Sequence, residues 1–219
     1  PRPSRPSARR RPATWSGDIL VPFAVESALS GVRKPVSPEQ RLWYRRSFEA
    51  PALTGDQRLL LHFGAVDWQS TVWVNGQQVG QHVGGYDPFS IDITAAVKDG
   101  ANELVLAVWD PTDTGFQPKG KQVLHPEGIL YTAVTGIWQT VWLETVPRDY
   151  IESLTIVPDV DREVVTVAVR ATAGLRVTLA ASDAGSACGT ASGVAGQPIE
   201  MKIPLAKLWS PTSPHLYDL

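Results

Sequence analysis

The sequence has few of the features that mark common protein classes. Its 219 residues contain one cysteine, Cys188, which excludes an intramolecular disulfide and a zinc site built from several cysteines. No apolar run approaches the roughly 18 residues of a membrane-spanning helix. The motifs of nucleophile elbows, phosphate-binding loops, dinucleotide-binding loops and zinc proteases are also missing. We therefore assign no catalytic residue, cofactor or metal ion from motifs.

Alternating strand and helix patterns are absent from the chain. A (β/α)₈ barrel needs that alternation, so the sequence encodes no such barrel. Apolar residues nevertheless make up 43% of the chain and charged residues 19%, which allows a sizeable core. The length of 219 residues is comfortable for two domains.

Charge is distributed unevenly along the chain. Residues 1–13 carry five arginines and no acid, and removing these five leaves 15 basic against 22 acidic residues, a net charge of −7 on the body. A basic tail on an acidic body argues against a nucleic-acid-binding fold. The Pro/Arg/Ser-rich residues 1–14 are predicted to be a disordered tail. The chain starts at Pro1 and has no apolar signal core, which indicates trimming or a removed signal, and we favour a periplasmic or secreted location over a cytoplasmic one.

Short apolar runs recur at about ten-residue spacing between Leu59 and Trp109, as in an all-β sandwich or barrel. Asn75-Gly76 lies between two such runs and predicts a two-residue hairpin loop. The run Glu103–Trp109 is apolar at almost every position, which predicts a strand covered on both faces. Residues 89–93 alternate between apolar and polar, which predicts a strand with one face exposed to solvent.

The rest of the first domain, predicted over residues 15–147, follows the same pattern. Residues 24–30 could form one helical turn ended by Gly31, and Leu42–Phe48 reads as the first firm strand. Residues 111–136 form a long loop, which in a compact domain is usually functional or disordered. Residues 139–144 are predicted to close the domain with a last strand.

A second domain is predicted over residues 148–219, beginning at the Pro147-Arg148 boundary. Four alternating runs, at residues 151–157, 164–170, 175–181 and 199–203, predict strands of a small sandwich. The Ala/Gly/Ser-rich segment Asp183–Gln197 is predicted to be a flexible loop.

Five short motifs occur in an order that identifies a family. They are Phe63-Gly64-Ala65-Val66-Asp67, Val72-Trp73-Val74-Asn75-Gly76, Gly84-Gly85-Tyr86-Asp87-Pro88-Phe89, Trp109-Asp110-Pro111-Thr112-Asp113 and Gly136-Ile137-Trp138-Gln139. Together they resemble the N-terminal sugar-binding domain of the family 2 glycoside hydrolases, the β-galactosidase and β-glucuronidase group. The excess of tryptophan, eight against five Tyr and five Phe, also fits a carbohydrate protein, because aromatic faces stack on the C–H faces of sugars.

The resemblance implies a jelly-roll, galactose-binding-like β-sandwich followed by a smaller immunoglobulin-like β-sandwich. The Cys-Trp-Cys core of antibody domains is missing from the second. Residues 208–211 and 215–219 resemble the family's last segment before its catalytic barrel. The chain is therefore expected to be truncated ahead of a (β/α)₈ domain.

Retaining glycosidases need two carboxyl groups about 5 Å apart. In this family both are glutamates on barrel strands, so no catalytic residue is expected here and the fragment alone is expected to be inactive. The resemblance implies the non-catalytic N-terminal part of an enzyme that hydrolyses β-O-glycosidic bonds. Its expected partners are a β-glycoside bound through the parent's barrel and the chain's own downstream catalytic domain. Galactoside, glucuronide and mannoside all stay open, and so does a homo-oligomer.

By position, Asp67 matches a substrate-contacting asparagine of the β-galactosidase branch, and Asp110 falls near a matching aspartate. A carboxylate suits this task because it accepts hydrogen bonds from two vicinal hydroxyls. The alternative is that both are turn residues bonded to nearby amides. Trp68 is a stacking platform or a half-exposed core residue.

The long loop supplies the other candidates for substrate contact. Asp113, Lys119, Lys121 and Gln122 are expected to reach the barrel mouth, unless they are solvated loop residues. Asp110 and Asp113 could hold a hard cation, but their spacing is too common to predict a metal site.

Two other functions fit a pair of sandwiches. A free-standing carbohydrate-binding module or lectin is the main alternative, since jelly rolls serve that purpose as well. A purely structural pair of sandwiches is the third.

Overall fold

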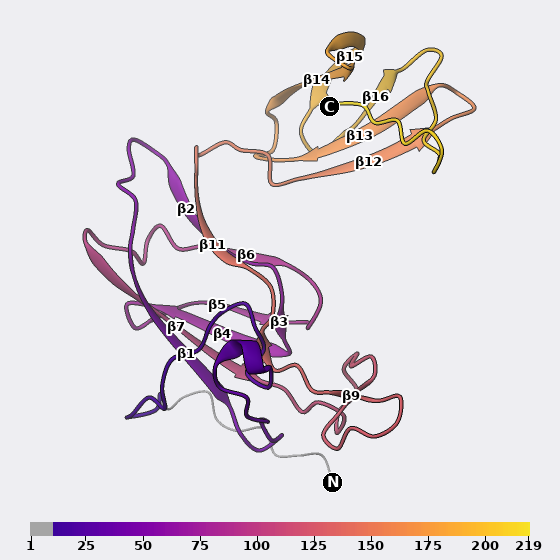
Figure 1. Ribbon diagram of the computed structural model, residues 1–219. Coiled ribbons are helices and arrows are strands. Elements are labelled where there is room, and N and C mark those ends of the chain that lie inside the picture. Colours follow the sequence, from indigo (N-terminus) through magenta and orange to yellow (C-terminus); the bar gives the residue numbers. More distant parts are fainter. Residues whose placement is uncertain (1–10) are drawn as a thin grey trace. The chain divides into compact units, whose positions relative to one another are not determined.

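The computed structural model describes residues 11–219, which form two compact units (Figure 1). The first unit extends to Val146 and the second comprises Pro147–Leu219. Within the described residues the one helix is the 3-10 turn η1 (Ala28–Ser30), capped by Ser27 and Gly31, so no described helix could cross a membrane. All other regular elements are strands, which confirms the all-β prediction.

Two antiparallel sheets build the first unit, in the strand orders β1-β7-β4-β5 and β11-β2-β6. Apart from the β4-β5 hairpin, neighbouring strands of these two sheets are not consecutive in sequence, as expected of a jelly roll rather than a meander. Two short pairs, β10-β3 and β8-β9, complete it. The bounds are β1 Leu42–Glu49, β2 Arg58–Phe63, β3 Val66–Asp67, β4 Gln69–Val74, β5 Gln77–Val83, β6 Phe89–Asp92, β7 Ala101–Trp109, β8 Gln122–Val123, β9 Tyr131–Thr132, β10 Gly136–Ile137 and β11 Val141–Val146.

The two sheets share one apolar core. Leu61 and Phe63 from β2 belong to the same buried cluster as Val72 from β4 and Leu106 from β7. Ile93, which follows β6, is also fully buried there. Burial of alternate residues from both sheets makes this unit a β-sandwich, as predicted.

Strand β7 is covered on both faces, which confirms the prediction from its apolar pattern. Leu106 and Val108 face the core, whereas Val105 and Ala107 point to the opposite face and are also buried. Trp43 of β1 and Trp73 of β4 lie across from Ala107 and Val105, and their rings stack with centroids 5.6 Å apart. Since β7 lies between β1 and β4, this tryptophan pair spans the middle strand.

The segment before β1 also packs on the first unit. The Trp109 indole N–H donates to the Pro38 carbonyl at 2.7 Å, and the Arg45 guanidinium lies 4.8 Å from the centre of the Trp15 ring. Residues 1–10 of the predicted disordered tail lie outside the described residues. Residues 11–14 have no helix or strand, but Arg11 forms a bidentate ion pair with Glu103 at 2.6 and 2.8 Å.

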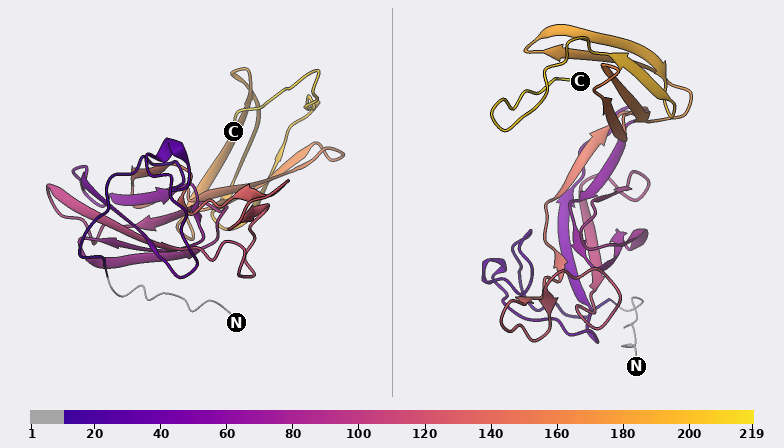
Figure 2. Two further views of the ribbon diagram at one scale, coloured as in Figure 1. Left: turned by 60° about the horizontal axis from the view of Figure 1, so that its bottom comes forward. Right: turned by 90° about the vertical axis from the view of Figure 1, so that its right-hand side faces the viewer.

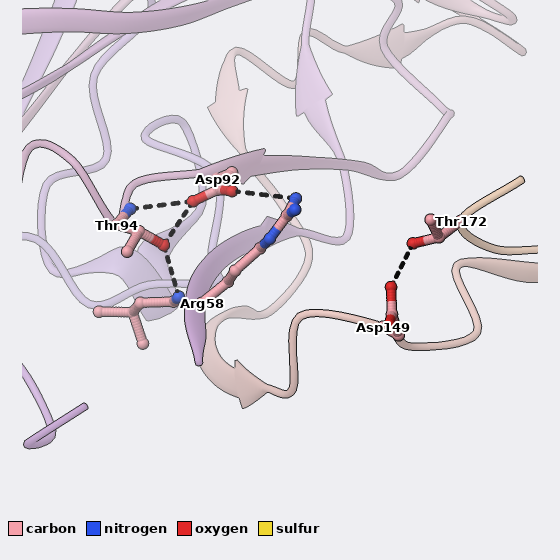
Figure 3. A network of polar contacts seen from close by, with 6 residues as sticks. Arg58, Asp92, Thr94, Asp149 and Thr172 are labelled. Carbon is pink, nitrogen blue, oxygen red and sulfur yellow. Dashed lines mark hydrogen bonds and ion pairs between the residues drawn. The ribbon is translucent and has the colours of Figure 1, made fainter. Parts of the chain in front are cut away.

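A polar network fixes the turn that follows β6 (Figure 3). The Asp92 carboxylate accepts hydrogen bonds from the backbone N–H and the hydroxyl of Thr94, at 3.0 and 2.6 Å. The Leu59 N–H then donates to the Thr94 hydroxyl at 2.8 Å, and Arg58 lies 3.7 Å from Asp92. The network joins β2 to the end of β6, so the loop after β6 leaves the sheet at a fixed point. In the second unit, a separate contact joins the Thr172 hydroxyl to Asp149 at 2.7 Å.

The second unit also has two sheets around one core. Sheet β12-β13-β16 and sheet β14-β15 both contribute to a buried cluster that contains Val167, Leu179 and Met201. The two-sheet arrangement agrees with the expected small sandwich. The bounds are β12 Ser153–Asp159, β13 Val164–Arg170, β14 Arg176–Asp183, β15 Ser186–Val194 and β16 Pro198–Lys202.

The prediction of a flexible loop over Asp183–Gln197 is wrong, because β15 lies within it and pairs with β14 along its length. Ala184 and Gly185 have φ of 47° and 83°, which suits the tight turn between the two strands. A Cβ on Gly193 would lie 2.6 Å from the Ile199 side chain, and one on Gly189 would lie 2.6 Å from a backbone oxygen of Lys202. The small residues therefore allow close packing of β15 on β16.

The long loop of the first unit is also more structured than predicted. Gln122–Val123 and Tyr131–Thr132 form the parallel pair β8-β9 within it. The loop projects from one end of the sandwich (Figure 2). Strand β7 begins at Ala101, two residues before the predicted run Glu103–Trp109.

We expect Asn75→Ala to lower the stability of the first unit by about 2 kcal/mol. Asn75 has φ of 50°, its Nδ2 donates to Ala96 and Asn102, and its Oδ1 accepts from the Glu103 N–H. Seven of the eight tryptophans precede Pro147, so tryptophan fluorescence during urea unfolding follows mainly this unit. The exposed Gln77→Ala is the control, and equal midpoints for the two variants would contradict the assignment.

We expect Gly193→Ala to lower the stability of the second unit by about 1–3 kcal/mol, since Ile199 is buried and must move. The control is Ser192→Ala on the adjacent, exposed position of the same strand. Amide hydrogen exchange of β14 and β15 measures the effect. Unchanged protection in Gly193→Ala would show that β15 does not pack closely on β16.

Candidate functional site

The predicted site residues lie at the ends of strands and in the long loop of the first unit. Asp67 ends β3, Trp68 follows it through a cis peptide bond, and Asp110 comes directly after β7. Gln122 begins β8. Asp113, Lys119 and Lys121 lie between Asp110 and Gln122 in the loop.

The structure brings Asp67 and Gln122 together. The Gln122 side-chain amide donates to Asp67 Oδ2 at 3.2 Å, and its oxygen accepts from the Val134 N–H at 2.6 Å. The other carboxyl oxygen, Oδ1, lies so close to Gly85 that a Cβ there would be 2.5 Å away. Asp67 is only 3% exposed as a result. Its carboxyl group thus joins β3, the Gly84-Gly85 turn and the long loop.

Asp110 is 2% exposed and mainly holds the start of the loop. Its Oδ1 accepts from the Thr112 N–H at 2.8 Å, two residues ahead, which is the geometry of an Asx turn. Its Oδ2 accepts longer hydrogen bonds of 3.4 Å from the hydroxyls of Thr112 and Thr135. These bonds match the turn-residue alternative that the sequence left open for Asp110.

Glu26 lies near Asp110 and Asp67 and forms a cluster of buried carboxyl groups with them, although it was not among the predicted site residues. Its Oε2 accepts from the Thr135 N–H at 3.0 Å, and its Oε1 is buried with no hydrogen-bond partner. The signal available in the sequence was an acid directly after the apolar segment 19–25. Together, Glu26, Asp67 and Asp110 enclose the base of the loop.

Burial raises the pKa of all three carboxyl groups. For Asp67, loss of solvation is the largest cause and the nearby Asp110 adds to it, whereas the Gln122 hydrogen bond acts in the opposite direction. The combined effect raises the pKa of Asp67 to about 7. The pKa values of Asp110 and Glu26 are also raised, first by burial. Near neutral pH, Asp67 can therefore carry a proton and donate a hydrogen bond.

Three other candidates are less enclosed. Asp113 braces the loop, since its Oδ2 accepts from the Leu124 N–H at 3.3 Å. Trp68 is half-buried, and its carbonyl accepts from the Gly84 N–H at 3.2 Å. Lys119 is also half-buried, and its carbonyl accepts from the Gln122 N–H at 3.1 Å.

Trp138 and Tyr86 also belong to this region, although the sequence analysis gave them no site role. The Trp138 indole N–H donates to the Gly85 carbonyl at 2.7 Å. The Tyr86 ring meets the Trp138 ring edge-on, with centroids 6.0 Å apart. Both residues occur in the motifs that carry the family resemblance, so those motifs could have pointed to them.

Across residues 11–219, no three His, Cys, Asp or Glu side chains are arranged to hold a metal ion. A cavity of about 670 Å³ lies elsewhere in the first unit, between residues 15–22 and β1, and none of the predicted site residues lines it. The cluster of Glu26, Asp67 and Asp110 can form hydrogen bonds. Its buried carboxyl groups fix the long loop, and the polar side chains of that loop are partly exposed.

The raised pKa of Asp67 gives a pH-dependent stability. An unfolded aspartate releases its proton near its ordinary pKa of 3.8, whereas folded Asp67 retains it up to about 7. The stabilisation by the neutral carboxyl is complete below the lower value and is lost as pH rises through the higher one. Relative to Asp67→Asn, we expect the wild-type chain to lose about 1 kcal/mol per pH unit across that window. Urea unfolding from about pH 4 to 8 measures this, and parallel profiles for the two proteins would contradict it.

Comparison with known proteins gives the family. The model of the glycosyl hydrolases family 2 sugar binding domain matches residues 20–147. A β-glucuronidase of Paenibacillus borealis is 27% identical over 238 residues, covering 98% of this chain and 39% of the relative. A β-galactosidase of Thermoanaerobacter pseudethanolicus is 34% identical over 119 residues, covering 53% of this chain and 15% of the relative.

Solved structures show the same similarity. A β-glucuronidase of Faecalibacterium prausnitzii superimposes with a TM-score of 0.71 at 28% identity, covering 98% of this chain and 41% of that one. The chain thus spans less than half the length of each of these relatives. Since the family model covers more than half of the chain, this protein belongs to the glycosyl hydrolases of family 2, and residues 20–147 form the sugar-binding domain of that family.

Proposed function

We propose that this chain is the non-catalytic N-terminal part of a longer enzyme that hydrolyses β-O-glycosidic bonds. The match of residues 20–147 to the family's sugar-binding domain is the observation that carries the proposal. The relatives named β-glucuronidase and β-galactosidase are two to seven times as long as the part that this chain matches. The catalytic glutamates would then belong to a separate barrel domain, and the 219 residues alone would be inactive.

The long loop is the part proposed to reach the substrate entrance. Gln122 binds Asp67 with one end of its amide and the Val134 N–H with the other, so the middle of the loop is fixed to β3. A loop fixed in this way presents polar groups in a defined position, which is what specific binding requires.

Within the predicted site, burial suggests a division of roles. Trp68, Asp113, Lys119 and Gln122 are partly exposed and are the groups proposed to face the sugar. Asp67 and Asp110, at 3% and 2% exposure, are proposed to act mainly by holding them in place. A protonated Asp67 donating to a sugar oxygen would need Gln122 to swing aside.

The proposal is tested by expressing the longer reading frame that contains this chain and measuring hydrolysis of p-nitrophenyl β-D-glucuronide and β-D-galactoside. We expect the longer protein to hydrolyse at least one of them and the 219-residue chain to hydrolyse neither. Gln122→Ala should lower kcat/KM by about tenfold or more, because it frees the loop and removes a polar contact.

Gln57→Ala is the matched control, because Gln57 precedes β2 and, among residues 11–219, bonds only within its own turn, to the Thr54 backbone and side chain. Equal kcat/KM for Gln122→Ala and the wild type would exclude the loop from the substrate entrance. Hydrolysis by the 219-residue chain itself would overturn the assignment as a non-catalytic part.

A further inference from the structure

Tyr86 is an exposed aromatic residue that follows Gly85, the glycine packed on the buried Asp67 carboxyl. Its side chain is 49% exposed, although it follows the buried Gly84 and Gly85 directly. A single exposed aromatic ring is ordinary on a protein surface. What distinguishes Tyr86 is that its ring is held by Trp138 and reaches the loop that carries Lys119 and Gln122.

The Tyr86 ring has two neighbours, Trp138 and the long loop at Gly120. Trp138 meets it edge-on at 6.0 Å, with the two ring planes at 76°. The same indole fixes the preceding peptide by donating to the Gly85 carbonyl at 2.7 Å. A Cβ on Gly120 would lie 3.5 Å from the Tyr86 hydroxyl, so the ring reaches the long loop.

The backbone beneath Tyr86 is fixed as firmly as the ring. The Gly84 N–H donates to the Trp68 carbonyl at 3.2 Å, and Gly85 packs directly on the Asp67 carboxyl. A side chain at position 85 would clash with that carboxyl, so glycine is required for this approach. Tyr86 is thus the exposed end of an assembly whose other members are buried or half-buried.

We infer that Tyr86 forms an aromatic sugar-binding subsite, on which one C–H face of a pyranose ring stacks, and that Trp138 is the positioning residue that holds it. The inference rests on the proposed function, since it assigns the ligand class of the same site. An amphipathic ring suits the task because its face is apolar while its hydroxyl can stay hydrated. The polar side chains of the loop, Lys119 and Gln122, lie one residue before and two after Gly120, which the Tyr86 hydroxyl approaches.

The test uses the full 219-residue chain and saturation-transfer NMR with methyl β-D-glucuronide and methyl β-D-galactoside as probes. We expect the strongest transfer to the ring protons of one sugar face. Sorbitol, which carries hydroxyls but no ring, should show little transfer. Tyr86→Phe should bind as the wild type does, whereas Tyr86→Leu should weaken binding about tenfold.

Trp142→Leu is the matched control, because Trp142 is also exposed, at 44%, and stacks on His62 in the other sheet. It should bind the sugars as the wild type does. Trp138→Phe keeps an aromatic ring but loses the hydrogen bond to the Gly85 carbonyl, and it should weaken sugar binding. The unfolding midpoint of Tyr86→Phe, which should equal that of the wild type, is the reference for stability. Equal binding by Tyr86→Leu and the wild type, or no binding by the wild type, would overturn the inference.

The two proposals can fail separately. If the longer protein hydrolyses its substrate and Tyr86→Leu binds sugar as the wild type does, the proposed function stands and Tyr86 is not part of the site. Tyr86-dependent sugar binding with no hydrolysis by the longer protein would support the subsite and overturn the enzymatic assignment.

Discussion

A hydrogen bond between two side chains far apart in sequence organises the candidate site. Gln122 donates to Asp67 across 3.2 Å and accepts from the Val134 N–H at 2.6 Å, so both ends of its amide are used. One contact thereby divides a long connection into two shorter loops, which reduces the freedom of each. The cost is a carboxyl group taken out of water, and the raised pKa of Asp67 reflects that cost.

The buried acids explain why the loop can be both long and ordered. Asp110 holds the first turn through Thr112, and Glu26 holds the end of the loop through the Thr135 N–H. Each acid therefore satisfies a backbone donor that would otherwise be orphaned in the interior. Under the proposed function the same carboxyl groups would serve both the fold and the site, so substitutions at them need a stability measurement beside any activity measurement.

The strands of the first unit were predictable where short-range rules decide the structure. Asn75 and Gly76 adopt φ of 50° and 82°, as a two-residue hairpin loop requires, and the apolar pattern of β7 gave its burial on both faces. Strand β15 was missed because its alanines, glycines and serines carry low strand propensity. Their small size matters only once Ile199 and Met201 are packed against them, and that contact is not visible in local sequence.

The site was predictable only in part for a similar reason. Family motifs identified Asp67 and Asp110, but not that the first is covered by Gly85 and the second engaged by Thr112. Glu26 lies 84 residues before Asp110, so only the folded chain shows that they are neighbours. Tyr86 had the opposite difficulty, since its motif is apparent but its exposure is a property of the fold.

The covering of β7 on its outer face bears on where this domain begins. The Trp43–Trp73 pair lies across from Ala107 and Val105, and Trp109 at the end of β7 donates to Pro38, which belongs to the segment ahead of β1. A chain that began at Leu42 would leave the Trp109 indole N–H without its Pro38 acceptor and would remove the Trp15 ring from the Arg45 guanidinium. The irregular residues before Leu42 therefore belong to the folded sandwich, and their removal would lower its stability.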